Sequence, residues 1–232
     1  MKFFSPLLKG ILVKRYKRFM ADILLETGEQ ITAHCANSGS MLGVNDPGAE
    51  VLVSPADNPK RKLKYTWELI KVDQNWVGIN TALSNKIVQE GIENGVTTEL
   101  QGYASLRREV KYGKNSRIDI LLEDPDKPNC YVEIKNVTLR RDQVAEFPDA
   151  VTARGTKHLQ ELANQVSAGD RAVMCYLVQR EDCDKFAIAQ DIDSAYAAAF
   201  ENAMLAGVEV ICYGCELTEK EIKLTSPLAL HI

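Results

Sequence analysis

Two short apolar runs between residues 116 and 138, SRIDILLE and CYVEIKNV, have the length and the Val and Ile content of β-strands. Each run carries charge in its middle: Asp119 in the first, and Glu133 and Lys135 in the second. A charge inside a buried strand is unfavourable unless a partner compensates it. The chain must therefore fold so that these three charges find partners.

The two runs predict a β-hairpin around the loop of residues 123–129. If Leu122 faces Cys130, Asp119 falls opposite Glu133, and directly opposed residues have Cβ atoms roughly 4.5–5.5 Å apart. Two carboxylates that close repel each other unless a proton or a cation lies between them. A divalent metal with oxygen ligands is the usual solution, and we expect Mg²⁺ or Mn²⁺.

Strand alternation places Lys135 on the same face as Glu133. Two carboxylates and an ammonium can hold a metal, orient a water and neutralise phosphate charge, which is the chemistry of phosphodiester hydrolysis. The alternative is a surface hairpin whose charged face points to solvent. The position of Asp119 across the hairpin, between two predicted helices, favours catalytic roles for Asp119, Glu133 and Lys135.

The first third of the chain alternates apolar and polar residues in about five short runs separated by Gly and Pro. This pattern predicts a small β-barrel, with an OB-like barrel as first choice. After residue 80 the pattern changes to helices alternating with strands. Helices are expected at 81–95, 152–166 and 194–207, and strands at 105–113, 116–123, 130–139, 171–180 and 208–217. That order predicts an α/β domain with a mixed sheet, so we divide the chain into domains 1–82 and 83–232.

Composition excludes several classes of protein. Apolar residues make up 45% of the 232 residues, and no apolar run approaches the roughly 18 residues of a transmembrane helix. The basic N-terminal segment is interrupted by charges and has no small-residue cleavage site, so we expect no signal peptide. Six scattered cysteines indicate reduced thiols in the cytoplasm. Cys212 and Cys215 form a single CxxC, which we interpret as structural rather than as a zinc or redox site.

Basic residues concentrate in the first third, although the net charge of the chain is −4. Two basic clusters contain aromatic neighbours, which is how OB-type barrels hold phosphates and bases of single strands. The alternative is an exposed strand edge whose lysines block aggregation. The candidate nucleic-acid-binding residues in these clusters are Lys14, Arg15, Tyr16, Arg18, Lys60, Arg61 and Lys62.

The helix expected at 152–166 places Arg154, Lys157, His158 and Glu161 on one face. We predict that Arg154, Lys157 and His158 add nucleic-acid contacts beside the metal site. The alternative is a solvent-exposed face of ion pairs. Thr152 or Asp149 is expected to cap the helix.

The arrangement of Asp119, a spacer and Glu133-Ile134-Lys135 resembles the PD-(D/E)XK nuclease core, although Ile118 stands where the motif's name has Pro. A helix that precedes this core often donates one more acidic ligand. The resemblance therefore implies Glu90, or Glu93 one turn later, as a metal ligand with Asp119 and Glu133.

Four longer segments, HCANSGSM, NTALSNKIVQE, YVEIKNVTL and FPDAVTARGTKHLQEL, together resemble the sugar fermentation stimulation protein A family. The resemblance covers nearly the whole chain. It implies an N-terminal OB-like domain, a C-terminal nuclease-like domain, DNA binding, and a link to the regulation of sugar (maltose) metabolism. The loop at 36–41 departs mildly from the family's usual residues, which leaves its role open.

The sequence thus predicts a mixed α/β protein in which an OB-like barrel precedes a PD-(D/E)XK nuclease-like domain. We expect a cytoplasmic DNA-binding protein with a nuclease site that uses Mg²⁺ or Mn²⁺. The alternative is a non-catalytic transcriptional regulator that uses the nuclease fold as a scaffold, although no helix-turn-helix pattern is visible. We expect DNA as partner and neither a membrane nor a small-molecule cofactor; a homodimer and the type of cleavage are left open.

Overall fold

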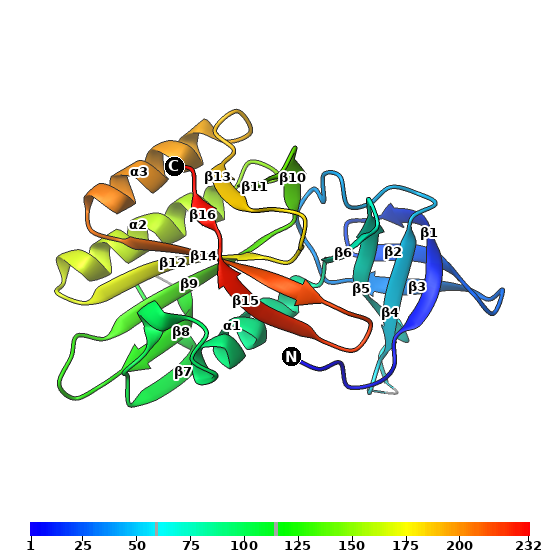
Figure 1. The fold of residues 1–232 in the computed structure, drawn as a ribbon, viewed down its shortest axis with the longest axis horizontal. Coiled ribbons are helices and arrows are strands. Elements are labelled where there is room, and N and C mark those ends of the chain that lie inside the picture. The colour runs from blue at the N-terminus through cyan, green and yellow to red at the C-terminus, as the bar shows by residue number, and fades with distance from the viewer. Residues whose placement is uncertain (59, 114–115) are drawn as a thin grey trace.

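The barrel at the start of the chain is made of short antiparallel strands closed by one parallel pair. The computed structural model describes residues 1–58, 60–113 and 116–232. In that part of the first 80 residues the strands are β1 (Leu8–Tyr16), β2 (Met20–Leu25), β3 (Gln30–Cys35), β4 (Glu50–Pro55), β5 (Tyr65–Val72) and β6 (Asn75–Gly78). They pair in the order β3-β2-β1-β4-β5-β6, and β3 also pairs with β5, which closes β1 to β5 into a barrel (Figure 1). The predicted OB-like barrel is confirmed.

The second domain alternates helices with strands as the sequence predicted. Its helices are η1 (Thr81–Leu83), α1 (Ser84–Glu93), η2 (Thr98–Leu100), α2 (Ala153–Ser167) and α3 (Ser194–Leu205). Its strands, within the described residues, are β7 (Ser105–Tyr112), β8 (Ser116–Glu123), β9 (Cys130–Val137), β10 (Leu139–Arg141), β11 (Val144–Phe147), β12 (Arg171–Val178), β13 (Lys185–Ile188), β14 (Glu209–Leu217), β15 (Ile222–Pro227) and β16 (Ala229–Leu230).

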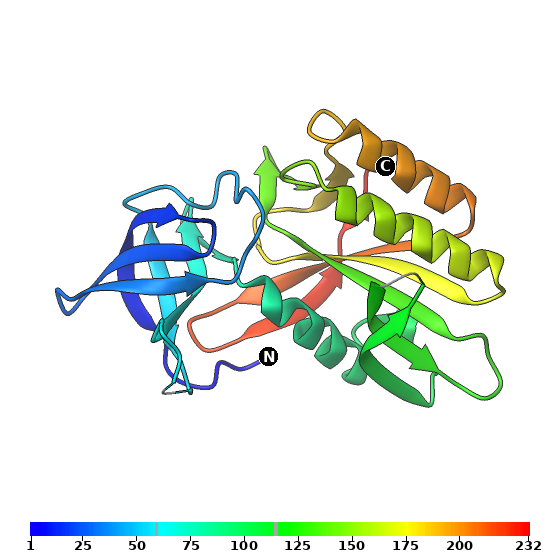
Figure 2. The same cartoon turned by 180° about the vertical axis from the view of Figure 1, so that it is seen from behind.

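The main sheet of this domain has the order β15-β14-β12-β9-β8-β7 and is mixed. β12 runs parallel to both of its neighbours, whereas the outer pairs are antiparallel. Helix α1 packs on one face, and α2 and α3 pack on the other (Figures 1 and 2). Because both faces are covered, β12 has an almost continuous apolar sequence. The predicted mixed α/β architecture is confirmed.

Four short strands form a second sheet that the sequence pattern did not predict. Its order is β10-β11-β13-β16, and β11 and β13 pair in parallel although they lie about 40 residues apart in the chain. Strands of two to four residues are too short to show an alternating pattern. Their pairing therefore depends on tertiary contacts.

The first residues of the chain pack against the second domain, although the sequence placed them with the barrel. Lys2 forms an isolated β-bridge with Glu221, and Met1 is buried in the core beneath α1. The domain boundary between residues 82 and 83 stays a prediction. Met1 and Lys2, which it assigns to the barrel, contact the second domain. None of the helices in the described residues is long and apolar enough to cross a membrane.

The CxxC pair lies inside β14. Cys212 belongs to the core on the α2 side of the sheet and Cys215 to the core on the α1 side, and both are free thiols. Burial raises the pKa of both thiols, which disfavours the thiolate needed for metal binding or redox chemistry.

Gly91 lets α1 approach β15 closely. A Cβ atom at this position would lie 2.3 Å from Leu224 Cδ2 and 3.2 Å from Leu224 Cβ. We expect Gly91→Val to lower the free energy of unfolding by about 2 kcal/mol, because the added atoms overpack this contact. The measurement is urea unfolding followed by circular dichroism.

The matched control is Lys86→Val, at an exposed position of the same helix. This substitution should lower the free energy of unfolding by only about 0.5 kcal/mol, through helix propensity. Equal losses for the two variants would show that α1 does not pack tightly on β15.

Candidate active site

A cleft of about 1050 Å³ lies between the barrel and the second domain. The barrel contributes the end of β1 and the loop of residues 37–40 to its walls. The second domain contributes β9 and the first turns of α1 and α2. Asp119, Glu133 and Lys135 all line this cleft. The structure thus brings the three charged strand residues together at the junction of the two domains.

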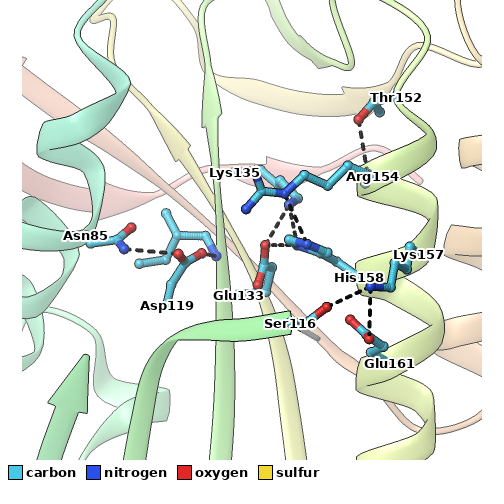
Figure 3. A network of polar contacts seen from close by, with 12 residues as sticks. Asn85, Ser116, Asp119, Glu133, Lys135, Thr152, Arg154, Lys157, His158 and Glu161 are labelled. Carbon is cyan, nitrogen blue, oxygen red and sulfur yellow. Dashed lines mark hydrogen bonds and ion pairs between the residues drawn. The ribbon is translucent and has the colours of Figure 1, made fainter. Parts of the chain in front are cut away.

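Asp119 lies where β8 and β9 separate. The two strands pair with Leu122 opposite Cys130, which is the predicted register, and the pairing ends two residues further along. Beyond that point Asp119 Oδ2 accepts a hydrogen bond from the backbone N–H of Ile134 at 2.7 Å. Asn85 Nδ2 of α1 donates to Oδ1 at 3.0 Å. The carboxylate therefore bridges the gap between the strands and has a fixed orientation (Figure 3).

Glu133 is the most deeply buried of the three charges, with 2% of its surface exposed. Its Oε1 accepts a hydrogen bond from Lys135 Nζ at 2.7 Å and also contacts Nδ1 of His158 (Figure 3). Arg154 Nε donates to His158 Nε2 at 3.3 Å. A guanidinium can only donate, so Nε2 must accept. Lys135 Nζ also lies 3.2 Å from Nδ1, but the contact of Nδ1 with Glu133 is shorter, and a carboxylate can only accept. We therefore assign the proton of a neutral His158 ring to Nδ1, directed at Glu133.

The two carboxyl groups have opposite pKa shifts. Burial, followed by the charge of Glu133, raises the pKa of Asp119 from 3.8 to about 6. For Glu133, burial raises the pKa, but Lys135 and His158 together outweigh it, and the net pKa is lowered. Glu133 therefore stays ionised, whereas Asp119 is the carboxyl group of the pair that is protonated more readily.

The donor set fits a divalent cation. Glu133 Oε2 is buried without a hydrogen-bond partner in the structure, and such an atom calls for an explanation. Carboxylate oxygens are the ligands of Mg²⁺, Mn²⁺ and Ca²⁺, and Mg²⁺ takes only one or two of them beside water and phosphate. In residues 1–58, 60–113 and 116–232, no three His, Cys, Asp or Glu side chains already form a metal-holding group. A cation here would rely on movement of side chains or on oxygen atoms from water and substrate.

Glu90, which the nuclease resemblance implied as a third acidic ligand, does not line this cleft. Its carboxylate lies 2.6 Å from the amino group of Met1, in a separate pocket between α1 and β15. The alternative, Glu93, is exposed and accepts a hydrogen bond from Gln89. The rotation of α1 about its axis explains the difference, because Asn85 lies on the side of the helix that faces the cleft and Glu90 lies on another side.

Helix α2 places its predicted residues in different surroundings. Arg154 and His158 line the cleft. Arg154 and Lys157 are exposed, as the alternative of a solvent-exposed ion-pair face would have them, whereas His158 and Glu161 are buried. Lys157 does not line the cleft; it donates to Ser116 Oγ at 3.1 Å and pairs with Glu161 at 3.5 Å. Thr152 caps the helix by accepting from the N–H of Gly155.

The first basic cluster of the barrel is divided in the same way. Arg15 and Arg18 line the cleft, but Arg15 uses its guanidinium to hold the carbonyl groups of the loop at residues 37–40. Lys14 and Tyr16 lie outside the cleft. Both contact Asp22, Lys14 through an ion pair at 3.7 Å and Tyr16 through a hydrogen bond at 3.0 Å. Of this cluster, Arg18 is both exposed and part of the cleft lining.

The second basic cluster lies at a neighbouring pocket of about 490 Å³. Arg61 and Lys62 line this pocket, whereas Lys60 is exposed beside it. Ala82 lines both this pocket and the main cleft. The two hollows are therefore adjacent, and a chain molecule could contact both.

Sequence reasoning missed the residues that connect the domains over the cleft. Ser40 Oγ donates to the carbonyl of Asp149 at 2.6 Å, and the N–H of Met41 donates to Asp149 Oδ2 at 2.8 Å. Asp149 was expected as an alternative helix cap, and it holds the barrel loop instead. Asn85 and Glu109, which also line the cleft, were missed too. Their only local signal is a polar residue next to an apolar run, which is too common to identify a site.

Two family models, curated relatives and a solved structure match this chain. The family model described as "SfsA N-terminal OB domain" matches residues 13–79, and "Sugar fermentation stimulation protein RE domain" matches residues 82–221. A sugar fermentation stimulation protein homolog of Paramagnetospirillum magneticum is 57% identical over 232 residues, covering 100% of this chain and 98% of the relative. A homolog of Geobacter sulfurreducens is 52% identical over 223 residues, covering 96% and 95%. The solved structure of Pyrococcus furiosus SfsA in complex with Ca²⁺ matches with a TM-score of 0.91 at 27% identity, covering 100% of this chain and 98% of that one.

The fold and the cleft define a two-domain protein in which an OB barrel is joined to an α/β domain with a mixed sheet. Both family models match, and together they cover most of the chain. The chain belongs to the sugar fermentation stimulation protein family, SfsA.

The raised pKa of Asp119 makes a prediction about stability. The native pKa, about 6, lies above the ordinary value of 3.8, so the folded state binds this proton more tightly than the unfolded state does. Stability contributed by the group is present below pH 4 and is lost as the pH rises through 6. In EDTA, wild type should lose up to about 3 kcal/mol relative to Asp119→Asn between pH 4 and pH 7.

Chemical denaturation at several pH values measures this difference. Asp126→Asn, at an exposed position in the loop between β8 and β9, serves as the control and should show no comparable trend. If the difference in free energy of unfolding between wild type and Asp119→Asn did not depend on pH, the pKa of Asp119 would not be raised in the folded protein.

Proposed function

We propose that this protein binds DNA and hydrolyses its phosphodiester bonds with Mg²⁺ or Mn²⁺ at the Asp119–Glu133–Lys135 site. One observation carries the proposal: a buried Glu133 with an unpartnered oxygen lies beside Asp119 and Lys135 in a cleft shared by both domains. A purely structural ion pair would have no need of an open cleft or of a second, destabilised carboxyl group. Perturbed carboxyl groups that line a cleft are typical of functional sites.

Asp119 and Glu133 would hold the cation, and a bound divalent cation would lower the pKa of a water and stabilise charge on the phosphate. The relative from Pyrococcus furiosus was solved in complex with Ca²⁺, which supports a divalent-cation site in this family. Asp119 is held in place for this role by the Ile134 N–H, so that its carboxylate needs little reorientation. His158 orients Glu133 in the same way.

Lys135 would neutralise phosphate charge and orient the attacking water. Its ammonium lies 2.7 Å from Glu133 Oε1, and the Lys135 side chain lines the cleft although only 13% of it is exposed. Arg154 and Arg18 lie on opposite walls of the cleft, from α2 and from the barrel. Cations on both walls suit a polyanionic strand between the two domains. Arg61 and Lys62 would extend this contact in the adjacent pocket.

The alternative function is a DNA-binding regulator that does not cleave. The names of the relatives refer to sugar fermentation, and regulation of sugar-metabolism genes would require DNA binding alone. In that case Lys135 and His158 would serve to neutralise Glu133 inside a scaffold. Metal-dependent cleavage separates the two functions, because phosphate contacts are common to both.

The decisive experiment is cleavage of labelled single-stranded, duplex and branched DNA in Mg²⁺, Mn²⁺ or EDTA. Wild type should cleave at least one substrate in a metal-dependent manner. Asp119→Asn and Lys135→Met should each reduce the rate at least about 100-fold, because the first removes an anionic ligand of the cation and the second removes a positive charge at the reacting phosphate. Glu93→Gln, an exposed carboxylate of α1, should retain the wild-type rate.

Tight binding by wild type without cleavage of any substrate would exclude the nuclease and leave the regulatory scaffold. Equal cleavage by wild type and Asp119→Asn would place the chemistry elsewhere in the chain. DNA binding measured by fluorescence anisotropy on the same samples distinguishes loss of chemistry from loss of binding.

A further inference from the structure

Strand β7 carries an acidic residue directly across from Asp119. The β7–β8 pairs on either side are Arg108 with Ile120 and Val110 with Ile118, which places Glu109 opposite Asp119. Glu109 lines the same cleft as Asp119 and Glu133. Three carboxylates from three neighbouring strands, β7, β8 and β9, therefore face one hollow.

The backbone at Glu109 has an unusual conformation. Its φ of 55° lies in the left-handed region, which a residue with a long side chain rarely adopts. Side chains two and four residues apart on a strand normally share a face. Here Leu106 contacts the core beneath α1, whereas Val110 and Tyr112 contact the core beneath α2. The turn at Glu109 changes the face of the strand and projects this side chain at the cleft.

One amide group links the two carboxylates. Asn85 Nδ2 donates to Glu109 Oε1 at 2.8 Å and to Asp119 Oδ1 at 3.0 Å. The partial positive charge of the amide hydrogens thus lies between two anionic groups, where a cation would neutralise them far better. Asn85 comes from the first turn of α1, the helix from which the resemblance implied an acidic ligand.

A separate observation concerns Glu133, the third carboxylate that lines this cleft. Glu133 is 2% exposed, and its Oε2 has no hydrogen-bond partner. That unpartnered oxygen belongs to a residue lining the cleft that Glu109 and Asp119 also line.

We infer that Glu109 is the third acidic ligand of the divalent cation held by Asp119 and Glu133, in the role that the resemblance implied for Glu90. The inference rests on the proposed function for the cation itself. Asn85 is a positioning residue that holds Glu109 and Asp119 close together when no cation is present. Since the described side chains do not already form a complete metal group, Glu109 would have to move inward from the Asn85 amide to act as a ligand.

The test is isothermal titration of the full chain, stripped with EDTA, with Mn²⁺ and with Ca²⁺. Three isosteric variants are compared with wild type: Glu109→Gln, Glu90→Gln and Asp119→Asn. Glu109→Gln should weaken Mn²⁺ binding about 10-fold or more, because it removes one anionic ligand. Glu90→Gln should bind Mn²⁺ as wild type does, because Glu90 lies in a separate pocket.

The outcome of the titration distinguishes the role of Glu109 from the existence of the metal site. Wild-type affinity in Glu109→Gln, with binding lost in Asp119→Asn, would overturn the inference and leave the proposed metal site intact. Loss of affinity in Glu90→Gln would return the third position to α1 and also overturn it. Absence of metal binding by wild type would remove both the inference and the proposed function.

Circular dichroism of the metal-free variants checks that each is folded. Glu109 is exposed in β7, so its substitution should leave the fold intact. Glu109→Asp provides a second variant that keeps the charge but shortens the side chain. Its Mn²⁺ affinity should fall between those of wild type and Glu109→Gln, whereas an affinity below that of Glu109→Gln would contradict a role based on charge.

Discussion

The buried carboxylate of Glu133 is the interaction on which the rest of the site depends. A charge in the middle of a sheet is tolerated only when its partners are close and well oriented, and removing one partner of such a pair typically destabilises a protein by about 3–5 kcal/mol. Lys135 supplies one partner from the same strand, and His158 supplies another from α2. Helix α2 must therefore dock in one rotational setting, with His158 inward, which also brings Arg154 to the cleft.

The separation of β8 from β9 is the second constraint. A regular ladder would have carried Asp119 and Glu133 side by side and closed the sheet above them. Instead the strands part after Ile120 and Val132, and Asp119 satisfies the N–H of Ile134 that the ladder no longer pairs. The side-chain hydrogen bond thus keeps a backbone group satisfied while the sheet opens into a cleft.

The barrel completes this cleft. Arg15 holds the loop of residues 37–40 through its carbonyl groups, and Ser40 and Met41 bind Asp149 at the start of the other wall. Gly39 lets the loop approach Asp149 closely, because a Cβ atom would lie 2.9 Å from Asp149 Oδ2 and force that carboxylate to shift. The barrel is consequently held against the α/β domain with Arg18 facing the acidic site. Positive charge from one domain and negative charge from the other meet across the same hollow.

The sequence by itself determined the elements whose signals are local. Alternating apolar residues defined the barrel, and short apolar runs defined the central strands. The hairpin loop set the register that brings Asp119 near Glu133 and Lys135. Helical spacing defined α2, and Thr152 was among its expected caps. Only the tertiary structure decided that Asn85 rather than Glu90 of α1 faces the cleft, that Glu109 turns toward it, and that Asp149 binds the barrel loop. The reason is physical: periodicity records which residues share a face of one element, whereas the rotation of a helix, a left-handed residue inside a strand and a contact between domains depend on packing against parts of the chain that are distant in sequence.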